Sequence, residues 1–198
     1  MITVSHLKKT FRRNKVEAVK DVSMEIRDGQ IFALLGPNGA GKTTTMRMLS
    51  TLLLPTSGSI CYDDVPLAED TEAIRRYETF STGMKQKTSI AICLLHDPDT
   101  IIFDEPTNGL DILTQNLIEE YMLKLKKEGK CIILSTHILD LARRLSDRVG
   151  VIVDGKSVYV GEMAELASSQ GVSTMEEAFL NLYKENHEEK AIVGKHKE

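Results

Sequence analysis

Hydrophobic and polar positions near the start of the chain follow the patterns of β-strands. Residues 2–7 alternate, a second strand-like segment covers Val16–Ile26, and a turn at Asp28-Gly29 leads into the apolar run Ile31–Leu35. Alternation is typical of a strand with one buried face, and a short apolar run after a turn is typical of a fully buried strand. The pattern predicts three strands here.

The rest of the chain alternates between helix-like and strand-like segments. The predicted helices cover residues 43–54, where Pro55 ends the pattern, and residues 83–95, where Asp97-Pro98 ends it. Strand-like runs cover residues 57–62, 101–103 and 131–135, and residues 151–160 predict a hairpin that turns on Asp154-Gly155.

Two further helices are predicted in the second half. The apolar residues Leu113, Leu117, Tyr121 and Leu125 are four apart and predict an amphipathic helix that ends near Gly129. Thr174 and Glu177 form a capping box for a last helix with Phe179, Leu182 and Tyr183 on it. Residues 185–198 are predicted to be a charged, solvated tail.

This order of elements predicts a single α/β domain that covers residues 1–198. Strands that alternate with helices imply a mostly parallel sheet flanked by helices, preceded by an N-terminal antiparallel β part. Ligands in such folds bind beyond the carboxyl ends of the strands. Three features converge on that edge: a glycine-rich loop after residue 35, Asp104-Glu105, and His137.

Composition fits a single folded domain and bears on two kinds of partner, nucleic acid and the membrane. The chain has 198 residues, of which 41% are hydrophobic and 27% charged, as in an ordinary soluble domain with a core. A net charge of -4 provides no overall electrostatic footprint for nucleic acid. The apolar runs are too short to span a bilayer, so a membrane function would need a partner chain. The three isolated cysteines are expected to be buried thiols.

The loop GPNGAGKT at residues 36–43 matches the P-loop pattern in full, between a buried strand and a helix. Its glycines let backbone N–H groups curl around phosphate oxygens, and the helix N-terminus adds partial positive charge. Lys42 would reach the terminal phosphates and Thr43 would bind Mg²⁺. The predicted nucleotide-binding residues are Gly36, Pro37, Asn38, Gly39, Ala40, Gly41, Lys42, Thr43 and Thr44.

Two carboxylates follow the strand at residues 101–103. Asp104 is suited to hold Mg²⁺ through water, and Glu105 to orient or deprotonate an attacking water. Taken alone, a carboxylate pair after a strand is most often a surface turn, but a complete P-loop in the same chain favours catalysis. His137, taken alone, is a hydrogen-bonded histidine, and residues 81–87 are a capped helix start.

Together these residues resemble the ATP-binding subunit of an ABC transporter. After the P-loop, STGMKQK at residues 81–87 resembles the signature motif, IIFDEP resembles Walker B, NGLD at residues 108–111 resembles the D-loop, and His137 resembles the switch histidine. Phe11 stands at the place of the aromatic residue that stacks on adenine. The ending TMEEAFLNLY resembles the C-terminal helix of subunits that serve two-component exporters.

The resemblance implies how such a chain works. MgATP would be held between the P-loop of one chain and the signature residues Ser81 and Gly83 of a second, in a head-to-tail homodimer, with Asp111 in the D-loop. Glu105 would act as base and His137 would brace the γ-phosphate. Hydrolysis would drive a separate transmembrane permease subunit, and the chain would lie in the cytoplasm against the inner face of the membrane.

The chain also departs from the family pattern. Thr82 and Met84 replace a glycine and a glutamine of the signature. Between Arg76 and Tyr77 the family has a core strand, the Q-loop glutamine and most of a helical subdomain, which this sequence lacks. The resemblance therefore implies an internal deletion that exposes apolar sheet surface.

Two other hypotheses remain. One is a non-catalytic ATP-binding module that cannot couple to a transporter, because the Q-loop region is missing. The other is a DNA-repair ATPase with the same motifs, which the absence of heptads for a long coiled coil disfavours.

Overall fold

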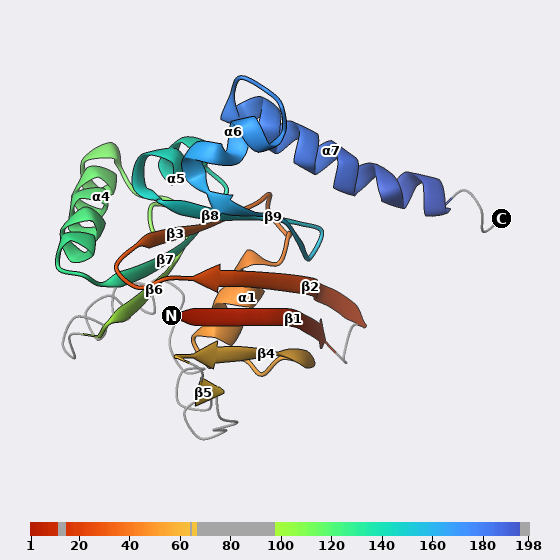
Figure 1. The fold of residues 1–198 in the computed structure, drawn as a ribbon, viewed down its shortest axis with the longest axis horizontal. Helices are drawn as coiled ribbons and strands as arrows, with labels where there is room; N and C mark the ends of the chain where they lie inside the picture. The colour runs from red at the N-terminus through yellow and green to blue at the C-terminus, as the bar shows by residue number, and fades with distance from the viewer. Residues whose placement is uncertain (12–14, 64, 67–97, 195–198) are drawn as a thin grey trace.

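The computed structural model describes residues 1–11, 15–63, 65–66 and 98–194 of the chain (Figure 1). The strands in these residues form one nine-stranded sheet in the order β5-β4-β1-β2-β9-β8-β3-β7-β6. The pairings among β5, β4, β1 and β2 are antiparallel, whereas those among β8, β3, β7 and β6 are parallel, so the sheet has two halves of different character. The predicted α/β fold with an N-terminal antiparallel part is confirmed.

The antiparallel half holds strands β1 (Ile2–Phe11), β2 (Val16–Ile26), β4 (Ser57–Tyr62) and β5 (Val65–Pro66). β1 pairs with both β2 and β4, and β4 pairs with β5. All three pairings are antiparallel, as expected for strands joined by short connections such as the one between β1 and β2.

The parallel half holds strands β3 (Ile31–Leu35), β6 (Thr100–Asp104), β7 (Cys131–Thr136) and β8 (Arg148–Val153). β3 lies between β7 and β8, and β6 lies beyond β7. Parallel pairing brings the carboxyl ends of β3, β6 and β7 to the same edge of the sheet. The last strand, β9 (Lys156–Glu162), pairs antiparallel with β8. Their turn has positive φ at Asp154 and Gly155, as a tight hairpin requires.

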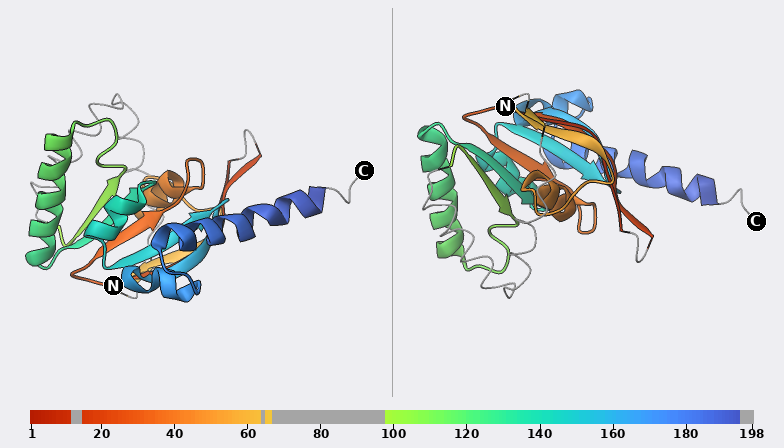
Figure 2. Two further views of the ribbon diagram at one scale, coloured as in Figure 1. Left: turned by 90° about the horizontal axis from the view of Figure 1, so that it is seen from above. Right: turned by 90° about the horizontal axis from the view of Figure 1, so that it is seen from below.

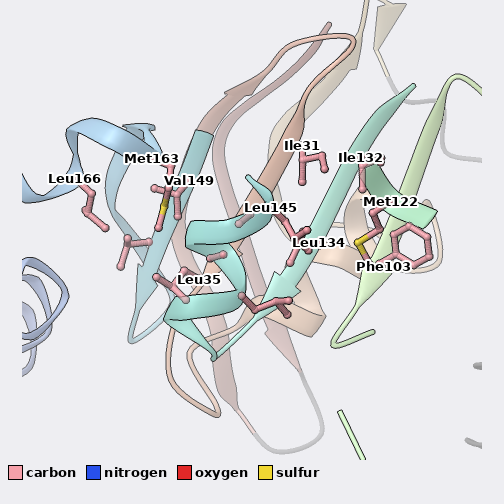
Figure 3. Packing of buried hydrophobic residues seen from close by; sticks show 14 of the residues in the cluster. Ile31, Leu35, Phe103, Met122, Ile132, Leu134, Leu145, Val149, Met163 and Leu166 are labelled. Atoms are coloured by element: carbon pink, nitrogen blue, oxygen red, sulfur yellow. The ribbon is translucent and has the colours of Figure 1, made fainter. Parts of the chain in front are cut away.

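The two faces of β3 separate two hydrophobic cores. On one face, Ile31, Ala33 and Leu35 pack with residues of the helices α4 (Ile112–Lys127), α5 (Leu139–Leu145), α6 (Leu166–Ser169) and α7 (Met175–Gly194), as Figure 3 shows in part. The short 3-10 helix η1 (Met163–Glu165) precedes α6. On the other face, Phe32 and Leu34 pack with α1 (Lys42–Leu49) and the antiparallel strands. Helices α1 and α7 thus cover opposite faces (Figure 2).

Two helix boundaries differ from the prediction. α1 ends at Leu49 and not at residue 54, because Thr51 takes a left-handed backbone with φ 61° that a helix cannot continue through. α7 runs to Gly194 where a tail from residue 185 was predicted. No glycine or proline interrupts residues 185–193, and the stacked rings of Tyr183 and His187 support the helix one turn apart.

The buried face of α4 also differs from the prediction. Met122 and Leu125 are buried and Ile118 packs against them, whereas Leu113 and Leu117 are 76% and 66% exposed. Both sets of residues have helical spacing. The sequence therefore predicted the helix correctly, and of its expected inward face Tyr121 and Leu125 pack in the core whereas Leu113 and Leu117 do not.

One end of the sheet bears on the predicted deletion. Among the described strands, β6 pairs with β7 alone and forms the edge of the sheet. The predicted helix at residues 83–95 and the junction at residues 76–77 lie outside the described residues. In the described part of the chain, no helix has the length and hydrophobicity needed to cross a membrane.

Candidate nucleotide site

The loop between β3 and α1 is held close to two neighbouring strands. A Cβ atom at Gly36 would lie 2.3 Å from the carbonyl oxygen of Ile152, and one at Gly41 would lie 2.5 Å from that of Ala18. Gly41 also has φ 105° and precedes α1 without a side-chain cap. Both positions therefore require glycine for steric reasons. Because no side chain caps α1, its first backbone N–H groups can donate to a bound anion.

Lys42 is the first residue of α1, and its side chain folds back into the loop. The ammonium group donates to the carbonyl oxygens of Gly36 at 2.9 Å and Pro37 at 3.2 Å. The Lys42 side chain is only 6% exposed, and its Nζ lies 3.3 Å from Glu105 Oε1. A buried ammonium needs such partners, and a nucleotide phosphate could replace them.

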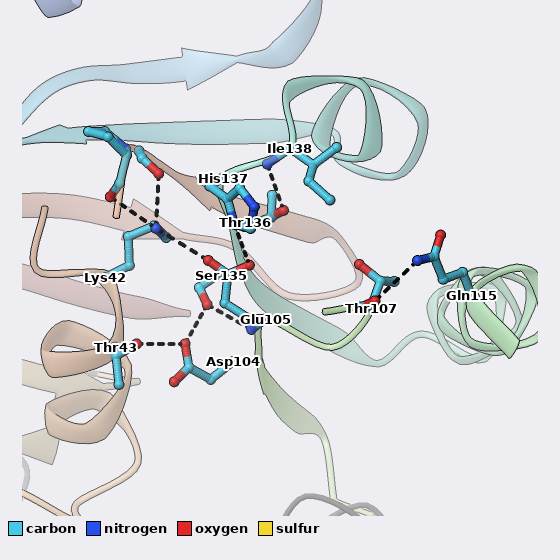
Figure 4. Close-up of polar contacts among 12 residues, drawn as sticks. Lys42, Thr43, Asp104, Glu105, Thr107, Gln115, Ser135, Thr136, His137 and Ile138 are labelled. Carbon is cyan, nitrogen blue, oxygen red and sulfur yellow. Dashed lines mark hydrogen bonds and ion pairs between the residues drawn. The ribbon is translucent and has the colours of Figure 1, made fainter. Parts of the chain in front are cut away.

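The pairing of β6 with β7 places the acidic residues (Figure 4). Asp104 ends β6 opposite Ser135, and the Ser135 hydroxyl donates to Asp104 Oδ1 at 2.5 Å. The hydroxyl of Thr43 donates to the same oxygen at 3.2 Å. A hydroxyl and a carboxylate thus converge from α1 and β6, and these are oxygen ligands of the kind that Mg²⁺ prefers.

Glu105 lies between the P-loop lysine and the histidine that follows β7. His137 Nδ1 donates to Glu105 Oε2 at 3.0 Å, and Lys42 approaches the other oxygen. Because an ionised carboxylate only accepts hydrogen bonds, Nδ1 carries the proton. Glu105 has a left-handed backbone with φ 50°, which is unfavourable for a residue with a Cβ atom and typical of functional sites.

A cavity opens between the P-loop and the end of β6. Seven predicted residues line it, together with Ala18 of β2 and Asn108: Asn38, Gly39, Gly41, Lys42, Thr43, Thr44 and Glu105. Asn108 belongs to the predicted D-loop, and its N–H donates to the carbonyl oxygen of Glu105. Ala18 was not predicted, because nothing in the local sequence of β2 indicates a ligand.

The remaining predicted residues lie apart from this cavity or outside the described residues. Phe11 ends β1, is 38% exposed and lies under Lys9 Nζ at 5.6 Å. Asp111 caps α4 and accepts from the Thr114 N–H at 3.0 Å. Hydrogen bonds from the Thr114 hydroxyl and N–H lower the pKa of Asp111. Ser81 and Gly83 are not in the described part of the chain.

A buried strand, a glycine loop before a helix, and two carboxylates of which one meets the loop lysine and the other the following threonine define the P-loop nucleotide-binding class. The sequence model of the ABC transporter family matches residues 19–78 and 65–108. NatA of Bacillus subtilis, an ABC transporter ATP-binding protein, is 32% identical over 91% of this chain and 97% of its own length. The chain therefore belongs to the ATP-binding proteins of ABC transporters, which are P-loop ATPases.

Two other similarities agree with this family. SrtF of Streptococcus pyogenes, a lantibiotic transport ATP-binding protein, is 31% identical over 91% of this chain and 96% of its own length. A solved ATP-binding subunit of an ABC transporter superimposes with a TM-score of 0.74 at 26% identity, over 92% of this chain and 99% of the other. The alignment with NatA extends over 239 positions, more than the 198 residues of this chain. NatA thus has residues without a counterpart here.

Proposed function

We propose that this chain binds MgATP in the cavity beside the P-loop and hydrolyses it to energise an ABC exporter. One observation carries the proposal: Glu105 lies between Lys42 and His137, within 3.3 Å and 3.0 Å of them. Helix α1 supplies Lys42, and the loops that directly follow β6 and β7 supply Glu105 and His137. A lysine for phosphate, a carboxylate for water and a histidine beside it are the groups that phosphoryl transfer to water needs.

The P-loop side of the cavity binds the phosphates. Lys42 exchanges the carbonyl oxygens of Gly36 and Pro37 for phosphate oxygens, and the N–H groups at the start of α1 donate to them. Thr43 and Asp104, whose oxygens already meet at 3.2 Å, hold Mg²⁺. When bound, Mg²⁺ neutralises charge on the phosphate oxygens.

The Walker B side directs the water. Glu105 accepts the proton of the attacking water once Lys42 has moved to the phosphate. His137 donates to the other carboxylate oxygen of Glu105. In the proposed complex it also contacts the γ-phosphate. Phe11, near the end of β1, stacks on the adenine of the nucleotide.

Family membership supports the proposed assembly. Ser81, Gly83 and the D-loop residue Asp111 act across a head-to-tail homodimer that closes on ATP, so that each ATP contacts both chains. A separate transmembrane subunit binds this dimer at the cytoplasmic face of the membrane. The similarity to SrtF, which serves lantibiotic transport, supports an exporter.

An internal deletion near residues 76–77 is part of the proposal. The family model matches in two segments, 19–78 and 65–108, and the NatA alignment is longer than the chain. The same observations favour a second candidate, a chain that binds ATP without hydrolysis or coupling.

Nucleotide binding by Lys42→Ala tests the proposal. Titration of the full chain with a fluorescent ATP analogue and Mg²⁺ is expected to show binding that Lys42→Ala abolishes. Lys124→Ala removes an exposed lysine of α4 that pairs with Glu128 and provides the matched control. Unchanged affinity in Lys42→Ala would refute the nucleotide site. Binding without phosphate release by the unaltered chain would favour the second candidate.

A further inference from the structure

Ser135 is a fully buried polar residue at the centre of the candidate site. It is the last residue but one of β7 and has no exposed surface. Its hydroxyl donates to Asp104 Oδ1 at 2.5 Å and accepts from the Glu105 N–H at 3.0 Å. A single side chain therefore contacts both consecutive acidic residues.

The direction of both hydrogen bonds is fixed by chemistry. An ionised carboxylate only accepts and a backbone N–H only donates, so the one hydroxyl proton must point to Asp104 and a lone pair to Glu105. The neighbouring Thr136 differs, since its hydroxyl accepts from the Ile138 N–H and contacts neither carboxylate in the contacts described. The role is specific to position 135.

The same residue holds the strained backbone of Glu105. The N–H of Glu105 also donates to the Ser135 carbonyl oxygen at 3.2 Å, so two oxygens of one residue share it. A left-handed backbone at a residue with a Cβ atom persists only where its surroundings fix it. Ser135 supplies part of that constraint and so fixes the backbone position from which the Glu105 side chain extends.

We propose that Ser135 is a positioning residue that sets Asp104 for Mg²⁺ and Glu105 for the attacking water through one hydroxyl group. The inference rests on the proposed function of those two carboxylates. Groups that hydrogen-bond a metal-binding carboxylate orient it and tune its affinity for the metal. Ser135 would thereby fix the position of the metal-binding carboxylate relative to the carboxylate of the base.

The test compares Ser135→Ala and Ser135→Thr with the unaltered full chain. Alanine removes the hydroxyl and leaves the backbone carbonyl, whereas threonine restores a hydroxyl at the same place. Ser157→Ala is the matched control, because the Ser157 hydroxyl also accepts from a backbone N–H, that of Ser23, but lies on β9 away from the cavity. ATP affinity is measured with Mg²⁺ and with EDTA, and phosphate release is measured against Mg²⁺ concentration.

The expected result is a smaller metal effect, defined as the gain in ATP affinity when EDTA is replaced by Mg²⁺. In Ser135→Ala, the gain in ATP affinity on adding Mg²⁺ falls by about tenfold or more, and turnover falls by a similar factor. Affinity in EDTA and the melting temperature stay close to those of Ser157→Ala. Ser135→Thr recovers most of the metal effect.

Two results would overturn the inference. One is a Mg²⁺ effect in Ser135→Ala equal to that of the unaltered chain. The other is an equal loss in Mg²⁺ and in EDTA, which a purely structural role produces. Because the binding ratio needs no turnover, it decides the role of Ser135 even in a chain that hydrolyses nothing. Failure of the proposed site itself would appear separately, as ATP binding that Lys42→Ala leaves intact.

Discussion

Lys42 Nζ lies 3.3 Å from Glu105 Oε1, and both side chains are largely shielded from water. The lysine proposed to bind phosphate and the carboxylate proposed to activate water are thus partners of each other. Entry of a phosphate between them must separate this pair. The proposed function therefore gives Glu105 two roles, as the counter-charge of Lys42 before nucleotide binds and as the base afterwards.

Glu105→Gln should separate these roles. Glutamine has nearly the same shape but cannot accept a proton from water, so turnover at saturating MgATP should fall by roughly 10²- to 10⁴-fold, as for a lost general base. ATP should still bind, since Lys42 loses a competitor for phosphate. Phosphate release and nucleotide titration measure the two effects. Glu128→Gln, at an exposed pair with Lys124, is the control, and equal turnover in both variants would contradict the assignment.

Gly41→Ala should damage the P-loop through sterics alone. The left-handed backbone at φ 105° disfavours any Cβ atom by about 1–2 kcal/mol. In addition, the new methyl group would lie 2.5 Å from the Ala18 carbonyl oxygen, which is backbone and cannot rotate away. The free energy of unfolding, from urea titration, should fall by more than this strain alone, and ATP affinity should fall with it.

Gly171→Ala separates the two causes. Gly171 is also left-handed, with φ 64°, but nothing lies within 4 Å of a Cβ atom built there. The free energy of unfolding of Gly171→Ala should fall only by the backbone strain, and this variant should keep its ATP affinity. Equal losses of stability in Gly171→Ala and Gly41→Ala would show that the approach to Ala18 has no energetic importance.

The sequence predicted the convergence of the site because parallel strands end at one edge. That rule places Lys42, Glu105 and His137 together without any knowledge of distances. It could not find Ser135, since the contact depends on the register that sets Asp104 opposite Ser135. A serine inside an apolar run carries no local signal for such a role.

Helical faces were harder to predict than helices. On α4, the set that contains Leu117 and the set that contains Met122 both recur at helical spacing, and only packing against β7 decides between them. The length of α7 was missed for a different reason. Its charged second half resembles a solvated tail in composition, but it also consists mostly of good helix formers without a stop signal.

Asp111 should make stability depend on pH. Its pKa is lowered in the folded chain, first by the Thr114 hydroxyl and then by the Thr114 N–H. A lowered pKa means that the ionised form stabilises the fold above the ordinary aspartate pKa, and that this contribution is lost as the pH falls through the folded pKa. Asp111→Ala should therefore lower the urea midpoint at pH 7, and the difference from the unaltered chain should shrink in acid.

Asp111→Asn is the matched variant for this test. Asparagine is as good a cap as aspartate but has no proton to bind. It should retain most of the stability at pH 7 and should lack the loss in acid that ionisation of Asp111 produces. If Asp111→Ala differs from the unaltered chain by the same amount at pH 7 and throughout an acid titration down to the folded pKa, ionisation of Asp111 is not the cause.

Leu113 and Leu117 should promote self-association of the isolated chain. They lie one turn apart on α4 and are 76% and 66% exposed. The apolar surface of two adjacent exposed leucines is removed from water only when another surface packs against it, and this removal is favourable. The double variant Leu113→Ser with Leu117→Ser should sediment with less dependence on concentration in the absence of nucleotide. Its free energy of unfolding should stay within about 0.5 kcal/mol, as is usual for exposed positions.

Leu180→Ser controls for the loss of any exposed leucine. Leu180 is 49% exposed and lies on α7, away from α4. It should leave the sedimentation unchanged, because an isolated leucine offers too little apolar surface to hold two chains together. Association that persists in the α4 double variant, or that Leu180→Ser removes equally well, would mean that the α4 surface is not what joins the chains.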